Sequence, residues 1–205
     1  MGMYSLALKV KLGNWNIFNG RKSDQAFVPI RDKVWKRDHY TCQFCGFQAQ
    51  EHQEIVNLDG DYRNNRLNNL VTACVFCAQC GFLEAVGNAY GGGKIIYLPE
   101  MSQTELNSFC HVLFCAMTNK TNYMNTAQTA YRNFRLRANA VDEKFGENTS
   151  EPGIFCQLIL NNECQPEKLK LFEDLRLLPS YAKFKTELED WAAAAVAELS
   201  QGQNE

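Results

Sequence analysis

Long apolar runs are missing from this 205-residue chain, so the sequence predicts no membrane-spanning helix; its most apolar window, Ser108 to Met117, is too short. The opening residues MGMYSLALKVKLGNWN lack the layout of a secretory signal peptide, because lysines interrupt their short apolar part. An excess of positive charge is missing too. The net charge of −2 argues against a free nucleic-acid-binding protein. Together these absences lead us to expect a cytoplasmic protein.

Cysteine, in contrast, is abundant. Nine cysteines without a secretory signal indicate a reducing compartment. Four of them form two Cys-x-x-Cys pairs, Cys42 with Cys45 and Cys74 with Cys77. Four thiolates can close a tetrahedral zinc site, because thiolate is a soft ligand and Zn²⁺ accepts this geometry without electronic penalty. The sequence therefore predicts one structural Zn²⁺, bound by these four residues.

Other interpretations of the cysteines are disulfides, buried free thiols and catalytic redox cysteines. A closed set of four thiolates argues against catalysis, since catalytic zinc keeps one position open for water. Cys80 complicates the ligand choice, because Cys77 to Cys80 is itself a Cys-x-x-Cys. We expect Cys80 to be a small buried thiol on the following helix. His39, just before the first pair, is not expected to be a ligand.

The pattern of apolar residues predicts an α+β fold that begins with a β-hairpin and loop over residues 1–30. Tyr4 to Lys11 alternates apolar and polar residues, Gly13-Asn14 is typical of a turn, and Trp15 to Phe18 is expected to pair back. A zinc module is expected over residues 31–99.

Within that module, Pro29 fits the first turn of a short helix that ends at Asp38. Gly46 is expected to supply a positive φ in the first knuckle. A strand at Glu54 to Leu58 and a helix from the second knuckle to about Val86 complete the prediction. The glycine-rich stretch Tyr90 to Lys94 is interpreted as a flexible link into a strand at Ile95 to Leu98.

Residues 100–205 are predicted to be a helical region packed on the module. Ser102 and Glu105 form a capping-box pattern at its first helix. Pro179 is expected to separate the last two helices. The further expected helices are Tyr123 to Lys144, Pro152 to Leu160, a segment opened by Pro166 with Leu169, Phe172 and Leu175, and Tyr181 to about Leu199.

Between Arg31 and Val86 the order helix, Cys-x-x-Cys, hairpin, Asn-Leu, Cys-x-x-Cys, helix resembles the zinc-bound ββα module of HNH endonucleases, which is of treble-clef type. The resemblance implies a histidine base, a metal ligand just before it and a histidine after the last knuckle cysteine. Asn57, Val56 and Ala78 occupy those three places. An amide accepts no proton at neutral pH, and the other two side chains offer no donor atom. We therefore expect the scaffold without an enzymatic activity.

A second resemblance extends over nearly the whole chain. The strings CQFCGFQA, IVNLDGDYRNNRLNNLVTACVFCAQC, GGGKIIYLPE, ELNSFCHVLFCA, EKFGENTS and RLLPSYAKF resemble the IcmJ (DotN) family of the Dot/Icm type IVB secretion system. That resemblance implies a subunit of the type IV coupling complex, peripheral to the inner membrane, which recruits effector proteins. It also implies the partners: the C-terminal tail of the DotL-type coupling ATPase, DotM, and the adaptors IcmS and IcmW.

Two other classes of function stay open at this point. An HNH-type metal-dependent nuclease, or an inactive nucleic-acid-binding derivative, predicts a basic groove beside Asn57 and Ala78. A redox or metal-sensing switch would use the extra cysteines. For a partner surface, the candidates are the aromatic residues Tyr123, Tyr131 and Phe134, although the pattern favours core packing for each of them, and the basic residues Arg132, Arg135 and Arg137.

Overall fold

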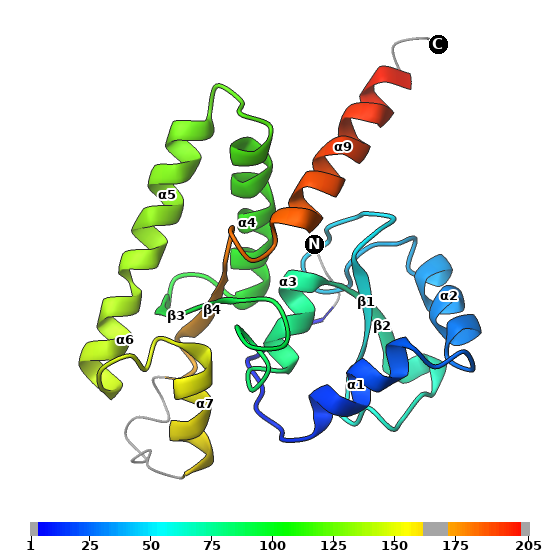
Figure 1. Cartoon of the computed structure of the whole chain (residues 1–205), viewed down its shortest axis with the longest axis horizontal. Coiled ribbons are helices and arrows are strands. Elements are labelled where there is room, and N and C mark those ends of the chain that lie inside the picture. Colours follow the sequence, from blue (N-terminus) through cyan, green and yellow to red (C-terminus); the bar gives the residue numbers. More distant parts are fainter. Residues whose placement is uncertain (1–3, 162–171, 202–205) are drawn as a thin grey trace.

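A computed structural model of the chain describes residues 4–161 and 172–201. Helices combine with two small antiparallel sheets (Figure 1), as the α+β prediction requires. The elements are α1 (Asn14–Lys22), α2 (Val28–Arg37), β1 (Gln53–Asn57), η1 (Leu67–Asn69), β2 (Leu70–Cys74), α3 (Val75–Ala78), η2 (Gln79–Gly81), β3 (Gly93–Tyr97), α4 (Gln103–Thr118), α5 (Met124–Leu136), α6 (Ala138–Phe145), α7 (Pro152–Leu160), β4 (Leu175–Pro179) and α9 (Lys185–Gln201).

The first sheet pairs β1 with β2, from Gln53 opposite Cys74 to Asn57 opposite Leu70. Helix α2 covers it through a small core that includes Val34 and Leu70. The proline in the first turn of α2 fixes a helical φ and has no N–H to leave unpaired, so the predicted helix forms. The predicted strand and helix of this part are confirmed to within a residue or two.

The second sheet pairs β3 with β4, and it brings together segments that lie far apart in the sequence (Figure 1). Gly93 lies opposite Pro179, and Tyr97 lies opposite Leu175. The helix predicted from Pro166 onward falls largely outside the described residues. Where it reaches Leu175 the prediction is wrong, because that residue begins a buried strand whose hydrogen-bond partner is β3.

The predicted N-terminal hairpin is also wrong. Residues 5–11 are extended without belonging to a sheet, and the expected second strand is helix α1. The alternation of apolar residues is real, since Leu6 and Leu8 pack against the core. The backbone of this segment, however, pairs with the turn after α3: Lys9 N–H donates to Cys80 O (2.8 Å), and Leu83 N–H donates to Lys9 O (3.2 Å).

Two helices differ in length from the prediction. The helix after the second knuckle ends at Ala78 and gives way to η2 and turns, rather than continuing to Val86. The long helix predicted from Tyr123 is two helices, α5 and α6, which are separated at Arg137. The predicted capping box of α4 and the helix opened by Pro152 are confirmed.

One aromatic cluster joins the half of the fold that carries the four cysteines to the helical half. The Phe76 ring of α3 lies 5.6 Å from Phe114 of α4, 4.9 Å from Phe184, and 5.7 Å from Trp191 of α9 (centroid distances). Phe76, Phe114 and Phe184 are almost completely buried. Aromatic side chains of this size contribute the largest apolar areas in a core. The base of α9 is therefore held by the module, while the rest of the helix extends away from the body (Figure 1).

The glycine-rich stretch before β3 is closely packed, so its interpretation as a flexible link is wrong. A Cβ on Gly91 would lie 2.5 Å from Gln79 Oε1 and 2.8 Å from Phe184 Cζ. A Cβ on Gly93 would lie 2.3 Å from the carbonyl oxygen of Leu178 in the paired strand. Glycine is needed here because no side chain fits between these elements.

We therefore expect Gly93→Ala to lower the free energy of unfolding by about 2–3 kcal/mol, because the added methyl group forces β3 and β4 apart. Gly20→Ala is the matched control. Gly20 lies in α1, and a Cβ added there would meet nothing within 4 Å, so the same change should stabilise by about 0.5–1 kcal/mol. Urea unfolding of both variants checks this, and equal stabilities would contradict the close packing.

Candidate metal centre

Four cysteines from the two knuckles come together in one buried cluster. The Sγ atoms of Cys42, Cys45, Cys74 and Cys77 all lie within 4.8 Å of one another. Cys45 Sγ and Cys74 Sγ are 3.6 Å apart, and all four cysteines are free thiols rather than disulfides. The structure thus assembles the four predicted ligand residues at one point, where they could hold a metal ion.

The geometry and the charge of this donor set fit a tetrahedral metal. Zinc–sulfur bonds of about 2.3 Å place tetrahedral sulfurs about 3.8 Å apart. This value is close to the 3.6 Å between Cys45 Sγ and Cys74 Sγ. Burial raises the pKa of the Cys74 and Cys77 thiols well above their usual range, because a buried thiolate lacks solvation. A bound dication would supply the missing positive charge and favour four thiolates.

The first knuckle is shaped by Gly46, which has the predicted positive φ of 79°. Its N–H donates to Cys42 O (2.9 Å), and Cys42 N–H donates to Phe47 O (2.8 Å), so the turn closes around the two cysteines. Glycine adopts this left-handed conformation without the steric cost that a side chain would bring.

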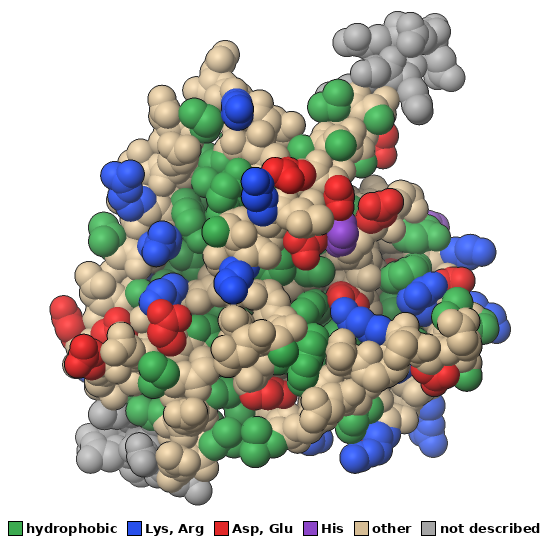
Figure 2. All heavy atoms as spheres, in the orientation of Figure 1, with side chains coloured by type: hydrophobic (Ala, Val, Ile, Leu, Met, Phe, Trp, Pro, Cys, Tyr) green, Lys and Arg blue, Asp and Glu red, His purple; other side chains and the backbone are tan. Residues whose placement is uncertain are grey.

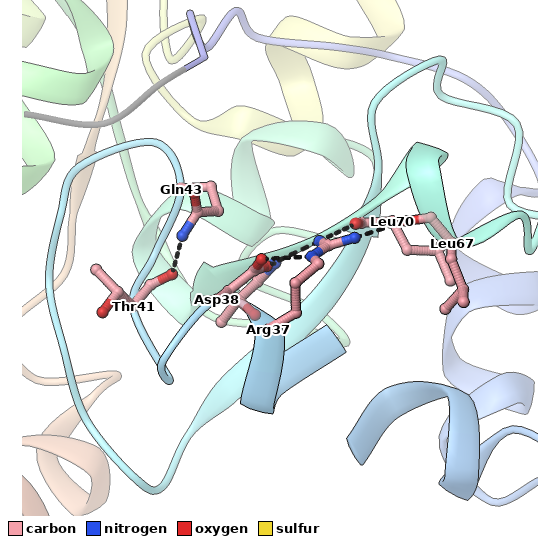
Figure 3. A network of polar contacts seen from close by, with 7 residues as sticks. Arg37, Asp38, Thr41, Gln43, Leu67 and Leu70 are labelled. Carbon is pink, nitrogen blue, oxygen red and sulfur yellow. Dashed lines mark hydrogen bonds and ion pairs between the residues drawn. The ribbon is translucent and has the colours of Figure 1, made fainter. Parts of the chain in front are cut away.

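A polar network fixes the first knuckle against β2, the strand that leads to the second knuckle (Figure 3). Asp38 Oδ2 accepts the N–H of Thr72 (2.8 Å), and Arg37 donates to the carbonyl oxygens of Leu67 (2.8 Å) and Leu70 (2.6 Å). Gln43 N–H donates to Thr72 O (2.9 Å). These bonds hold the end of α2 and the start of the first knuckle against the strand that leads to the second knuckle.

Two nearby candidates lie outside the cluster. Cys80 is fully buried and donates through Sγ to Phe76 O (3.4 Å), and burial raises its pKa to about 12. It is therefore a neutral thiol, which agrees with its predicted role, although it lies in η2 rather than on a continuing helix. His39 is exposed at the end of α2 and does not reach the four sulfurs.

Helix α4 adds two polar contacts to the cluster that were not predicted from the sequence. Asn107 Nδ2 donates to Cys77 Sγ (3.2 Å), and His111 Nε2 lies 3.3 Å from Cys74 Sγ. Burial lowers the pKa of the His111 imidazole to about 3, so the ring is neutral at pH 7. The signal in the sequence is a polar residue at every fourth position (Gln103, Asn107, His111), beside the apolar residues Leu106, Cys110 and Phe114 at helical spacing.

The three positions compared with HNH catalytic residues line one hollow of about 650 Å³. Val56, Asn57 and Ala78 are all buried there. The Asn57 amide is fully occupied: its Oδ1 accepts from Arg21 Nη1 (2.7 Å), and its Nδ2 donates to the carbonyl oxygens of Asp61 (2.9 Å) and Asn64 (2.7 Å). The side chain therefore holds the loop after β1 in place.

Among residues 4–161 and 172–201, one further group of three metal-ligating side chains is close enough to share an ion. It consists of Glu51, His52 and Asp190, which are exposed or half-buried. His52 Nε2 lies 2.7 Å from Asp190 Oδ2, and Trp191 Nε1 donates to Glu51 O (3.1 Å). These contacts join the base of α9 to the loop between the first knuckle and β1.

The candidate partner-facing residues are divided between surface and core. Tyr123 is 74% exposed, whereas the hydroxyl of the half-buried Tyr131 donates to Pro179 O (3.0 Å), and half-buried Phe134 packs against the core. Arg132 and Arg135 line a hollow of about 470 Å³ with Lys94, while Arg137 pairs with Glu100. Lys and Arg side chains gather along the α5 side of one face (Figure 2).

Comparison with known proteins identifies the family. No family model matches the sequence. The chain is 56% identical over 198 residues to the type 4 apparatus protein DotN of Legionella pneumophila subsp. pneumophila (strain Philadelphia 1), and the match covers 95% of this chain and 92% of that protein. The chain belongs to the DotN family. The resemblance to this family is thereby confirmed, and the match includes nearly the whole chain. No helix in the described part of the chain has the length and apolarity needed to cross a bilayer.

Proposed function

We propose that this protein is a non-catalytic, zinc-stabilised subunit of a Dot/Icm type IV secretion coupling complex, where it supports the recruitment of effector proteins. The observation that carries the proposal is the 56% identity to DotN over 95% of the chain, because a match of that extent includes the surface as well as the core. The complex would hold the coupling ATPase of the DotL type, DotM and the adaptors IcmS and IcmW. The subunit would be cytoplasmic and peripheral to the inner membrane through these partners.

The role proposed within the complex is to bind the C-terminal tail of the coupling ATPase. A tail that binds as an extended or helical segment gains a large interface without any chemistry by its receptor. We expect a synthetic DotL-type tail peptide to bind the full-length protein with a dissociation constant of micromolar or below in calorimetric titration. A peptide of the same composition in scrambled order is the control. If the two peptides gave the same heat of binding at micromolar concentration, the proposed role as receptor of the tail would be refuted.

The cofactor we propose is one structural Zn²⁺, bound by Cys42, Cys45, Cys74 and Cys77. The separation of the sulfurs, their burial and the soft character of thiolate support zinc over Mg²⁺ or Ca²⁺, which prefer oxygen ligands. Elemental analysis of protein purified without added metal is expected to give one zinc per chain. Protein that is folded and metal-free would refute this assignment.

We propose further that the chain has no nuclease activity, although its zinc module resembles the HNH ββα module of treble-clef type. The support is chemical: Asn57 cannot act as a base, and both ends of its amide are already hydrogen-bonded. Supercoiled plasmid incubated with the protein and Mg²⁺ or Mn²⁺ should stay intact. Nicking that EDTA abolishes, and that a Cys42→Ser protein lacks, would instead indicate an HNH-type nuclease.

A further inference from the structure

A buried polar stripe on α4 faces the cysteine cluster. Gln103, Asn107 and His111 are spaced four residues apart, so their side chains lie on one face of the helix over two successive turns. They are 3%, 0% and 8% exposed. Buried polar side chains are costly unless each finds a partner. The partners of these three residues show what the stripe does.

Two members of the stripe contact the sulfurs directly. Asn107 Nδ2 donates to Cys77 Sγ at 3.2 Å, and His111 Nε2 lies 3.3 Å from Cys74 Sγ. Asn107 has its Oδ1 occupied by the N–H of Gln103 (2.9 Å), so its amide can only present the NH₂ group to the sulfur. The direction of this hydrogen bond is therefore fixed by the residue one turn earlier.

The ring of His111 is held in place by aromatic neighbours on both faces. Its centroid lies 3.7 Å from that of Phe47, at 7° between planes, and 4.3 Å from that of Phe76, at 22°. A ring clamped in this way cannot turn its Nε2 away from Cys74 without displacing one of the phenylalanines. Packing thus aims the imidazole edge at the sulfur.

The third member connects the stripe to the second sheet. Gln103 Nε2 donates to Leu177 O (2.9 Å) as well as to Asn107, and its Oε1 accepts the Leu177 N–H (2.8 Å). A continuous series of hydrogen bonds therefore leads from β4 through Gln103 and Asn107 to Cys77. The segment between the two strands, and not the zinc module alone, completes the surroundings of the sulfurs.

We propose that Asn107 and His111 are positioning residues of the metal centre, which donate N–H···S hydrogen bonds to the metal-bound thiolates of Cys77 and Cys74 and strengthen the binding of the ion. This inference rests on the zinc centre proposed above. An N–H donor disperses the negative charge of a thiolate and fixes the orientation of the ligand. Removing such a donor typically weakens metal binding by about 10–100-fold.

The test replaces each donor with an apolar residue of similar shape. Asn107→Leu removes the amide, and His111→Phe removes the ring nitrogens while it keeps an aromatic ring between Phe47 and Phe76. Val112→Ala is the control, because Val112 lies on the same helix, is 63% exposed and is not in the stripe. Each protein is loaded with zinc for competition with a chelator, and with Co²⁺ for its thiolate-to-cobalt charge-transfer band.

We expect both donor variants to bind zinc about 10–100-fold more weakly and to show a charge-transfer band at lower energy, because an unbonded thiolate gives up an electron more easily. The Val112→Ala protein should match the wild type. Donor variants whose zinc affinity stays within about twofold of the wild type, with an unshifted band, would overturn the positioning role.

A measurement on the unaltered protein covers the case in which a variant does not fold. In wild-type protein loaded with an NMR-active cadmium isotope, N–H···S bonds transmit scalar coupling from the metal to the side-chain N–H protons of Asn107 and His111. Coupling at these protons supports the proposal. Its absence at both residues in a cadmium-loaded protein refutes the positioning role alone, whereas a wild-type protein that binds no metal refutes the zinc centre.

Discussion

A Cys77→Ser protein is expected to bind no zinc and to accumulate in the insoluble fraction. A serine hydroxyl does not ionise at neutral pH and is a poor ligand for zinc, so only three thiolates remain. Coordination to a structural Cys₄ site contributes on the order of 10 kcal/mol to folding, which is comparable to the whole stability of a domain of this size. Solubility after expression and elemental analysis of any soluble protein are the measurements.

Two other cysteines provide controls for that experiment. Cys80→Ser changes a buried thiol outside the cluster, and Cys115→Ser changes an exposed one on α4. Both proteins should be soluble and should retain one zinc per chain. Loss of zinc from the Cys80→Ser protein would reassign the fourth ligand. A Cys77→Ser protein with the zinc content and melting temperature of the wild type would exclude Cys77 as a ligand.

Arg21→Met is expected to lower the free energy of unfolding by about 3 kcal/mol. Arg21 is buried, and it donates to Asn57 Oδ1 (2.7 Å), Asn65 Oδ1 (3.0 Å) and Ile55 O (2.6 Å). Burial lowers the pKa of its guanidinium to about 10, so it is still charged at pH 7. Methionine fills similar space without donors, and it leaves the buried oxygens of Asn57 and Ile55 without this donor. Urea unfolding gives the difference.

The matched control for this change is Arg132→Met on α5. Arg132 is exposed, and losing it should alter the stability by no more than about 0.5 kcal/mol. If the two variants were equally stable, Arg21 would not be what holds the loop after β1, and the structural role given to Asn57 would lose its support.

Features set by short stretches of sequence are predictable. The two Cys-x-x-Cys pairs indicate the cluster, and the capping box at Ser102 marks the start of α4, because each depends on neighbouring residues. Helix α1 is not predicted although its signal is local: Asn14, Phe18 and Arg21 are buried at helical spacing. The alternation in the preceding residues favours one strand of a hairpin, but an extended chain gives the same pattern without a partner strand.

Features set by distant pairing are not predictable. Leu175 to Pro179 becomes a strand because β3 supplies its hydrogen bonds, and nothing near it in the sequence indicates that partner. The close packing of Gly91 has the same origin, since Phe184 comes from the far side of that pairing. Asn107 and His111 stand out only as polar residues among the apolar residues of the buried face of α4, and their target sulfurs are evident from the folded arrangement alone.

The pairing of Tyr97 with Leu175 means that the intervening chain leaves the sheet and returns to it at one place. The exposed loop between α4 and α5 can therefore gain or lose residues without changing the distance between those two anchor points. The two knuckle turns have no such freedom, because the spacing within each Cys-x-x-Cys pair sets where its two sulfurs lie in the cluster. Differences in chain length should accordingly concentrate in the loop between α4 and α5, which makes this loop a suitable place to insert a reporter tag.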